Sequence, residues 1–154
     1  MPALTMPAFG AFSSVAPLVL RVITGVIMAA HGYGKLVSGP SGFAGTLSGL
    51  GVPAAGLMAW AVVLVELVGG IALVLGVVTR LAGLLITVNL IVAISLVKYD
   101  KGLIASMDSP GVGYELDLAL IAGALALVLM GPGPVSLDRL LGIEKTVSAP
   151  AATA

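Results

Sequence analysis

The chain has 154 residues, of which 59% are hydrophobic and 9% are charged, and its mean hydropathy is +1.19. A soluble domain carries about 25% charged residues, so this composition excludes a water-soluble globular fold and predicts an integral membrane protein. Seven basic residues balance seven acidic ones and cysteine is absent, which excludes a polybasic nucleic-acid-binding surface, disulfides, thiolate metal sites and thiol–disulfide chemistry by the chain itself.

The first apolar segment, residues 15–37, is long enough to cross a membrane, which takes about 20 residues. It carries three side chains that are costly to place in hydrocarbon, namely Arg21, His31 and Lys35. Residues 1–14 lack the basic region that begins a signal peptide. We therefore expect an N-terminal tail and a first helix that is retained.

One face of this first helix carries small residues between its charged ones. Spacings of four and three from Arg21 lead to Gly25, Met28, Gly32 and Lys35. Glycines at this spacing allow the backbone of another helix to approach closely. The pattern predicts a helix-packing face.

The second and third apolar segments, residues 54–78 and 81–97, form a predicted helical hairpin. Glu66 is the only charge in the second segment, and Asn89 is the main polar residue of the third. Because the connection at residues 78–80 is very short, the two helices must be antiparallel.

The remaining segments complete the pattern of helices and loops. Residues 43–50 predict a short interfacial helix, and the polar stretch 98–113 predicts an exposed loop. A fourth apolar segment spans residues 114–130 and stops at the Gly-Pro-Gly-Pro run of residues 131–134. Residues 136–144 predict a brief amphipathic surface helix.

These segments predict an all-α protein, a transmembrane four-helix bundle over residues 15–141. It lies between the tail 1–14 and a C-terminal tail, 142–154, that we expect to be disordered. An even number of spans places both termini on one side, and four basic residues on that side against three on the other favour cytoplasmic termini in a bacterial plasma membrane.

Polar residues at the middle of the bundle form the first candidate site. Glu66 and Asn89 fall at similar depth in an antiparallel hairpin, so we expect a hydrogen bond between them. The long side chain of Arg21 is predicted to pair with Glu66. The group is either a ligand or proton site at mid-depth, or an arrangement that only fixes helix packing.

A second candidate cluster lies toward the opposite membrane face, with His31, Lys35, Tyr114, Glu115 and Asp117. Histidine suits proton exchange or a hydrogen bond to a quinone carbonyl. Alternatively, Lys35 extends to the lipid headgroups and the carboxylates favour a helix N-terminus. One histidine with nearby carboxylates is too little for a metal site. The candidate site residues are therefore Arg21, His31, Lys35, Glu66, Asn89 and Glu115.

Several motifs taken together resemble the DoxX family of bacterial four-helix membrane proteins, over residues 18–141. The motifs are Leu20–Gly25, His31–Leu36, Phe43–Ala44, Gly49–Pro53, Glu66–Gly70, Leu75–Gly76, Thr79–Arg80, Asn89, Gly131–Gly133 and Ser136–Arg139.

The resemblance implies an inner-membrane protein whose relatives are linked to thiosulfate:quinone oxidoreduction and, in mycobacteria, to a membrane oxidoreductase complex with superoxide dismutase and a sulfurtransferase. It names no catalytic residue. The polar residues that fit the family pattern are Arg21, His31, Lys35, Glu66, Arg80 and Asn89.

Two functions follow as hypotheses. The first is a membrane subunit of an oxidoreductase or oxidative-stress system that handles a quinone or docks redox protein partners; the chain itself supplies no other cofactor. The alternative is a non-enzymatic scaffold or assembly protein, or a small-solute permeation protein, in which the buried charges are structural. The lipid bilayer is the expected partner in either case, a homo-oligomer is one further expectation, and nucleic acid is excluded.

Overall fold

The structure, a computed structural model, describes residues 13–105 and 112–144, and the regular elements in these ranges are helices. The long helices are α2 (Ala16–Val37), α4 (Ala55–Leu75), α5 (Thr79–Ala93) and α6 (Glu115–Met130). The short elements are η1 (Ser13–Val15), α3 (Pro40–Gly49), η2 (Ile94–Lys98), η3 (Tyr99–Lys101) and α7 (Leu137–Leu140).

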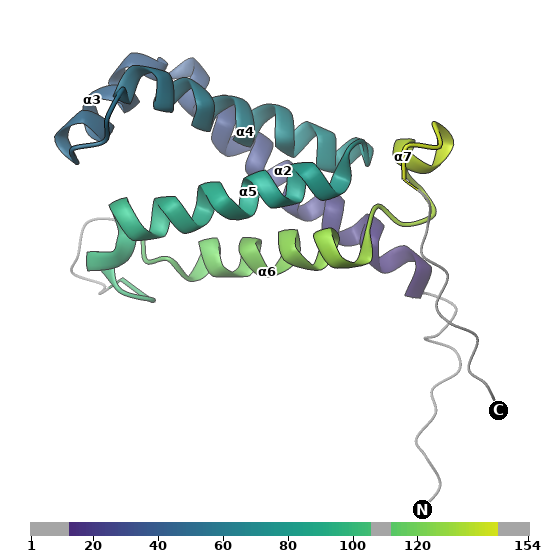
Figure 1. Cartoon of the computed structure of the whole chain (residues 1–154). Coiled ribbons are helices and arrows are strands. Elements are labelled where there is room, and N and C mark those ends of the chain that lie inside the picture. The colour runs from purple at the N-terminus through teal and green to yellow at the C-terminus, as the bar shows by residue number, and fades with distance from the viewer. Residues whose placement is uncertain (1–12, 106–111, 145–154) are drawn as a thin grey trace, which may run out of the picture.

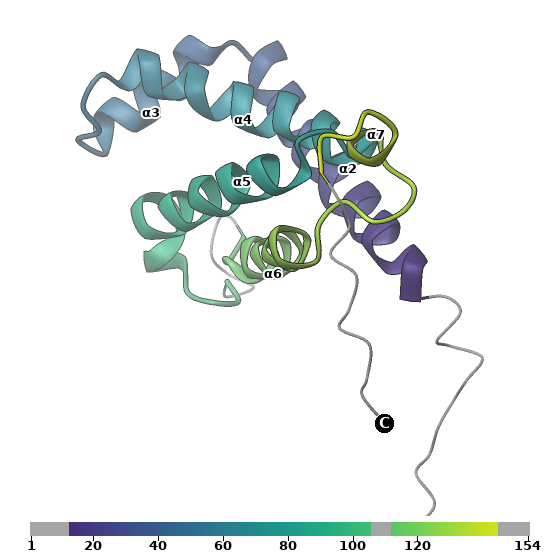
Figure 2. The ribbon, with the colours of Figure 1, turned by 45° about the vertical axis from the view of Figure 1, so that its right-hand side comes forward.

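The four long helices form a closed arrangement, which confirms the predicted all-α four-helix bundle. Helix α2 packs on α4 and α6, and α5 packs between α4 and α6. Helices α4, α5 and α6 run alongside one another while α2 crosses behind them at an incline (Figure 1, Figure 2). The beginning of α2 and helix α7 lie at one end of the bundle, and α3 lies at the other.

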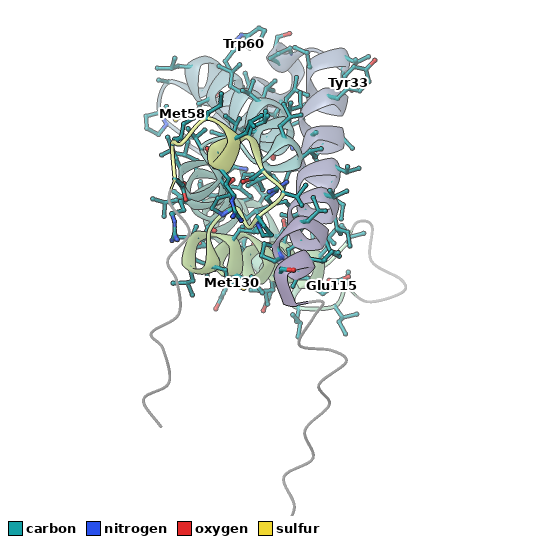
Figure 3. All side chains as sticks on the ribbon, turned by 90° about the vertical axis from the view of Figure 1, so that its right-hand side faces the viewer. Tyr33, Met58, Trp60, Glu115 and Met130 are labelled. Carbon is teal, nitrogen blue, oxygen red and sulfur yellow. The ribbon has the colours of Figure 1, made fainter. Side chains whose placement is uncertain are left out.

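Three helical stretches are long and apolar enough to cross a membrane: α2, α4, and α5 continued to Lys101. Helix α6 has 16 residues, or about 24 Å at 1.5 Å per residue. Figure 3, which views the bundle from the α7 end, shows side chains projecting outward all round it, with Tyr33, Trp60 and Met130 at the edge. The outer surface is rich in exposed Leu, Ile and Val, as expected for a surface in contact with lipid.

Helix α4 illustrates how a uniformly apolar helix is oriented. Leu64, which faces outward, is 53% exposed. The inward face follows spacings of four and three, with the buried residues Ala59, Val63, Glu66, Gly70 and Leu73. Because the outward residues are apolar and the inward ones include the charged Glu66, the tertiary packing rather than the hydrophobic pattern selects the buried face.

The close crossing of α2 and α4 confirms the predicted packing face of α2. A Cβ atom added at Gly25 would lie 2.6 Å from the carbonyl oxygen of Gly70, and one added at Gly70 would lie 2.5 Å from the amide nitrogen of Ala29. Gly32 lies just as tightly against the backbone of Leu67. Any larger side chain at these positions would force the helices apart.

At the α7 end, Asp138 holds the turn between α4 and α5. Its carboxylate accepts hydrogen bonds from the backbone amides of Val78, at 2.6 Å, and Thr79, at 2.9 Å, and from the Thr79 hydroxyl at 2.8 Å. Val78 has a φ of +43°, which is unfavourable for a β-branched residue. A carboxylate from 60 residues later in the chain thus caps the start of α5.

Contacts with the bundle continue past residue 141 as far as Glu144. Glu144 lies in the segment expected as a tail, yet its carboxylate is 2.9 Å from Arg80 Nε at the start of α5. Arg80 also donates to the carbonyl oxygen of Val128 near the end of α6. The tails 1–12 and 145–154 lie outside the described residues, so the expectation of disorder there stays a prediction.

Candidate functional site

A polar cluster joins three helices toward the α3 side of the bundle. Lys35 Nζ on α2 lies 2.5 Å from Glu66 Oε2 on α4, and the side-chain amide of Asn89 on α5 donates to Glu66 Oε1 at 3.2 Å. Glu66 is 5% exposed, so these two partners replace the water that its carboxylate loses on burial. The predicted Glu66–Asn89 contact is confirmed.

A second lysine–carboxylate pair lies between the end of the α5 stretch and the start of α6. Lys98 Nζ is 2.6 Å from Asp117 Oδ2, and Asp117 is 5% exposed. Asp117 belongs to the first turn of α6, where the helix dipole favours a negative charge. Lys98 ends the single π-helical turn η2, a rare conformation that occurs frequently at functional sites.

Both pairs line one cavity of about 210 Å³ at the α3 side of the bundle. Apart from the two pairs, Asn89 and His31, its lining is apolar. The apolar lining residues are Met28, Phe43, Leu47, Val62, Leu90, Val92, Ala93, Leu96, Val97, Leu116 and Leu120. A mostly apolar cavity with a few convergent polar groups is the usual form of a small-molecule site.

A second, more open hollow of about 540 Å³ adjoins this cavity between the end of α2 and α3. His31, Lys35 and Phe43 line both spaces. The Lys35 ammonium lies 5.6 Å from the centre of the Phe43 ring, within the range of a cation–π contact. His31 Nδ1 is 2.8 Å from the carbonyl oxygen of Ile27, so its Nδ1 is engaged within α2.

Arg21 does not belong to this site, and its predicted pairing with Glu66 is wrong. Its guanidinium donates to the carbonyl oxygens of Leu73, at 3.1 Å, and Pro132, at 2.5 Å. Leu73 lies in the last turn of α4, where carbonyls are short of helical partners. Glu66 lies seven residues before Leu73 in α4, about 10 Å away along the helix axis. The backbone carbonyls at the depth of Arg21 are therefore closer acceptors than the Glu66 carboxylate.

Glu115 also lies away from the cavity. It is exposed, and Figure 3 places it at the edge of the molecule. Residues two apart on a helix face nearly opposite directions, so Asp117 reaches the cavity and Glu115 does not. Of the cluster predicted near this membrane face, His31, Lys35 and Asp117 share the cavity, whereas Tyr114 and Glu115 are not among its lining residues.

The Lys98–Asp117 pair was not predicted, because Lys98 was assigned to an exposed loop. One sequence feature could have indicated the pair: the apolar run continues to Val97 and brings Lys98 to the end of a membrane-spanning stretch.

Among residues 13–105 and 112–144, no group of three His, Asp or Glu side chains is placed to hold a metal ion. The cavity presents charged, amide and imidazole groups for hydrogen bonding within apolar walls.

A family model, DoxX, matches residues 16–99 of the chain. This match covers more than half of the sequence. The chain belongs to the DoxX family. It thereby belongs to a family of membrane proteins, in agreement with its apolar helices.

Known proteins from three bacteria also align over most of the chain. "Putative oxidoreductase CatD" of Bacillus subtilis is 34% identical over 125 residues, covering 80% of this chain and 85% of CatD. "Inner membrane protein YqjF" of Escherichia coli is 31% identical over 130 residues, covering 82% and 92%. The membrane protein Rv3486 of Mycobacterium tuberculosis is 29% identical over 133 residues, covering 82% of each. No solved structure matches the chain significantly.

The DoxX match includes most of the cavity but not all of it. Lys35, Glu66, Asn89 and Lys98 lie within residues 16–99, whereas Asp117 lies beyond them. Helix α6 therefore adds the partner of Lys98 from outside the part of the chain that the DoxX model matches.

Proposed function

We propose that this DoxX-family protein is a membrane subunit of a bacterial oxidoreductase system and that its cavity binds a quinone headgroup. The observation that carries the proposal is the Lys35–Glu66–Asn89 network in the wall of an otherwise apolar cavity. A lysine ammonium has three donor hydrogens and a side-chain amide has two. Glu66 takes one from each, which leaves donors for the carbonyl oxygen of a ligand.

The net charge of the cavity wall supports a neutral ligand. The positive charges of Lys35 and Lys98 are each matched by a carboxylate within 2.6 Å. An inorganic anion would lose its hydration on entering the cavity and would meet no uncompensated positive charge there, which costs several kcal/mol. A quinone is neutral and dissolves in the bilayer, so it escapes that cost.

The size of the cavity supports a single ring. An engineered protein cavity of about 150 Å³ accepts benzene, and this cavity measures about 210 Å³. A substituted one-ring headgroup is therefore the best match in volume.

The names of two relatives support a redox role and a location in the inner membrane. CatD is named as a putative oxidoreductase and YqjF as an inner membrane protein. We extend both to this chain and place it in the bacterial plasma membrane, with the α7 end and its Arg80 and Arg139 cytoplasmic, following the distribution of basic residues. Redox proteins that exchange electrons with the bound quinone are its proposed partners.

Ligand-induced stabilisation tests the proposal. The full chain in lipid nanodiscs is titrated with a short-tailed 1,4-benzoquinone and with a naphthoquinone, and the melting temperature is followed. A saturating ligand at 100 times its Kd adds about 2.7 kcal/mol, so a clear upward shift is expected for the benzoquinone. Absence of a shift with either quinone, in a sample shown to be folded, overturns the proposal.

A matched pair of variants assigns the effect to the cavity. Asn89→Ala removes a donor that lines the cavity and is expected to weaken quinone binding about tenfold. Ser95→Ala removes a hydroxyl from η2, which continues α5; this hydroxyl donates to the carbonyl oxygen of Ile91 and does not line the cavity. We expect Ser95→Ala to bind quinone as the wild type does.

A scaffold role is the second candidate. In the described part of the chain, every buried side-chain nitrogen and oxygen has a hydrogen-bond partner, which suits charges that only hold helices together. Under this candidate, replacing Lys35 and Glu66 together by Met and Leu keeps the protein abundant and leaves cellular tolerance to oxidants intact. Under the quinone proposal, the same double variant stays abundant but loses that tolerance.

A further inference from the structure

We propose that the Lys98–Asp117 pair is a second recognition end of the cavity, so that the site selects a neutral ring with a hydrogen-bond acceptor at each of two ends. This inference rests on the proposed function and adds to it the class of ligand: a 1,4-dicarbonyl ring rather than any lipophilic ring. The first end is the Lys35–Glu66–Asn89 network, and the second is Lys98 with Asp117.

The two lysine–carboxylate pairs are built alike. The Lys35–Glu66 pair has side-chain exposures of 26% for the lysine and 7% for the carboxylate, and the Lys98–Asp117 pair has 27% and 7%. In each pair the carboxylate side chain is buried and the lysine side chain is partly exposed. Both pairs line the same cavity, but they come from separate helix contacts, α2 with α4 and the end of the α5 stretch with α6.

Each pair leaves donors for a ligand. The carboxylate takes one hydrogen of the ammonium and holds the flexible lysine in one place, while the other hydrogens of the ammonium stay available. A charged donor forms a stronger hydrogen bond than a neutral one. Because the carboxylate already holds the lysine in place, less side-chain entropy is lost on ligand binding than with a free lysine.

The local backbone supports a binding role for the second end. Lys98 closes the π-helical turn η2, and Ala93, Leu96 and Val97 from the same region line the cavity beside it. Single π-helical turns occur frequently at functional sites, so this backbone favours a binding role for Lys98 over one that only joins α5 to α6.

Three probes separate one-ended from two-ended binding. The full chain in nanodiscs is titrated with a short-tailed 1,4-benzoquinone, with a cyclohexenone bearing the same tail and a single carbonyl, and with the alkylbenzene of the same tail length. We expect the quinone to bind about tenfold more tightly than the cyclohexenone, because the quinone makes one more charged hydrogen bond. The alkylbenzene, which lacks acceptors, is expected to bind most weakly.

A double variant tests the second end directly. Lys98→Met with Asp117→Leu removes both charges, so neither is left buried alone. It is expected to weaken quinone binding about tenfold and to change cyclohexenone binding by no more than about twofold. Lys101→Met, which alters an exposed lysine in η3 that does not line the cavity, is the matched control and is expected to change neither.

The outcomes distinguish the two proposals. Quinone affinity that is unchanged in the double variant, or that falls by the same factor as cyclohexenone affinity, overturns the two-ended site while the proposed function stands. Failure of the wild type to bind any quinone overturns the proposed function itself. If the double variant does not fold, Lys98→Gln with Asp117→Asn keeps a neutral hydrogen bond in similar volume, and about a threefold loss for the quinone alone is then expected; no selective loss overturns the inference.

Discussion

At the α7 end of the bundle, buried charged side chains bind backbone groups, whereas at the α3 side they bind one another around a cavity. Arg21 donates to carbonyl oxygens in the last turn of α4 and just after α6, and Asp138 accepts from the amides at the start of α5. Lys35 and Glu66, by contrast, form a pair within the helices, as do Lys98 and Asp117.

Charged side chains that bind backbone groups and charged side chains that pair with one another are suited to different roles. Helix ends leave backbone groups without partners, and a charged side chain that binds them is occupied and fixes where helices meet. A pair of side chains satisfies its own charge while its remaining donors face a cavity. We therefore expect substitutions at the α7 end to act on stability and substitutions around the cavity to act mainly on ligand binding.

Arg21→Met should have the largest effect on stability. The side chain is 1% exposed and donates to the carbonyl oxygens of Leu73, Val74 and Pro132, and hydrogen bonds to charged groups contribute about 1.5–3 kcal/mol each. We expect a loss of about 3 kcal/mol in the free energy of unfolding, measured by titration with sodium dodecyl sulfate. Arg21→Lys, which keeps the charge but not the planar set of donors, should lose less. A wild-type stability for Arg21→Met would break the proposed division between the two ends.

Asp138→Ala should come next. It removes three hydrogen bonds at the start of α5 and leaves two backbone amides without their acceptor, for an expected loss of about 2 kcal/mol. Asp138→Asn keeps an acceptor oxygen and should lose roughly half as much. The control is Asp100→Asn at an exposed position of η3. If quinone binding at saturation also changed in Asp138→Ala, the two ends would be coupled and the comparison would need revision.

The smallest effect is expected from the Lys35–Glu66 pair. A double-mutant cycle with Lys35→Met and Glu66→Gln should give a coupling free energy of about 1 kcal/mol, since hydrogen bonds between membrane helices are modest and this lysine is partly exposed. The matched control is a cycle with Arg21→Met and Glu66→Gln, whose side chains have separate partners. That cycle should be additive within about 0.5 kcal/mol. A large coupling there would restore the pairing that the sequence suggested.

Several features of the site were predictable because they depend on position along a helix. The antiparallel hairpin follows from its short connection, and it places Glu66 and Asn89 at one depth. Alternating spacings of four and three on the first helix similarly predicted a face that packs on another helix, and the structure shows that this helix is α4. Both predictions need only the helical repeat and the topology.

The partner of Arg21 was not predictable in the same way. Apart from Glu66, helix α4 is apolar on every side, so its hydrophobic pattern does not show how far the helix is rotated about its axis or which carbonyls approach Arg21. The role of Asp138 was not predicted for a related reason. Its carboxylate accepts from backbone amides 59 and 60 residues away, and backbone groups have no sequence signature.

The amino-acid sequence alone was enough to predict a DoxX-like membrane protein with four helices. Segment length, hydropathy and turn residues are local properties, and the family motifs are short runs of sequence. The tertiary structure was needed to show which charges meet, because pairing depends on helix rotation and on contacts between segments far apart in the chain. It assigned Glu66 to Lys35, brought Lys98 to Asp117, and left between them a cavity of about 210 Å³.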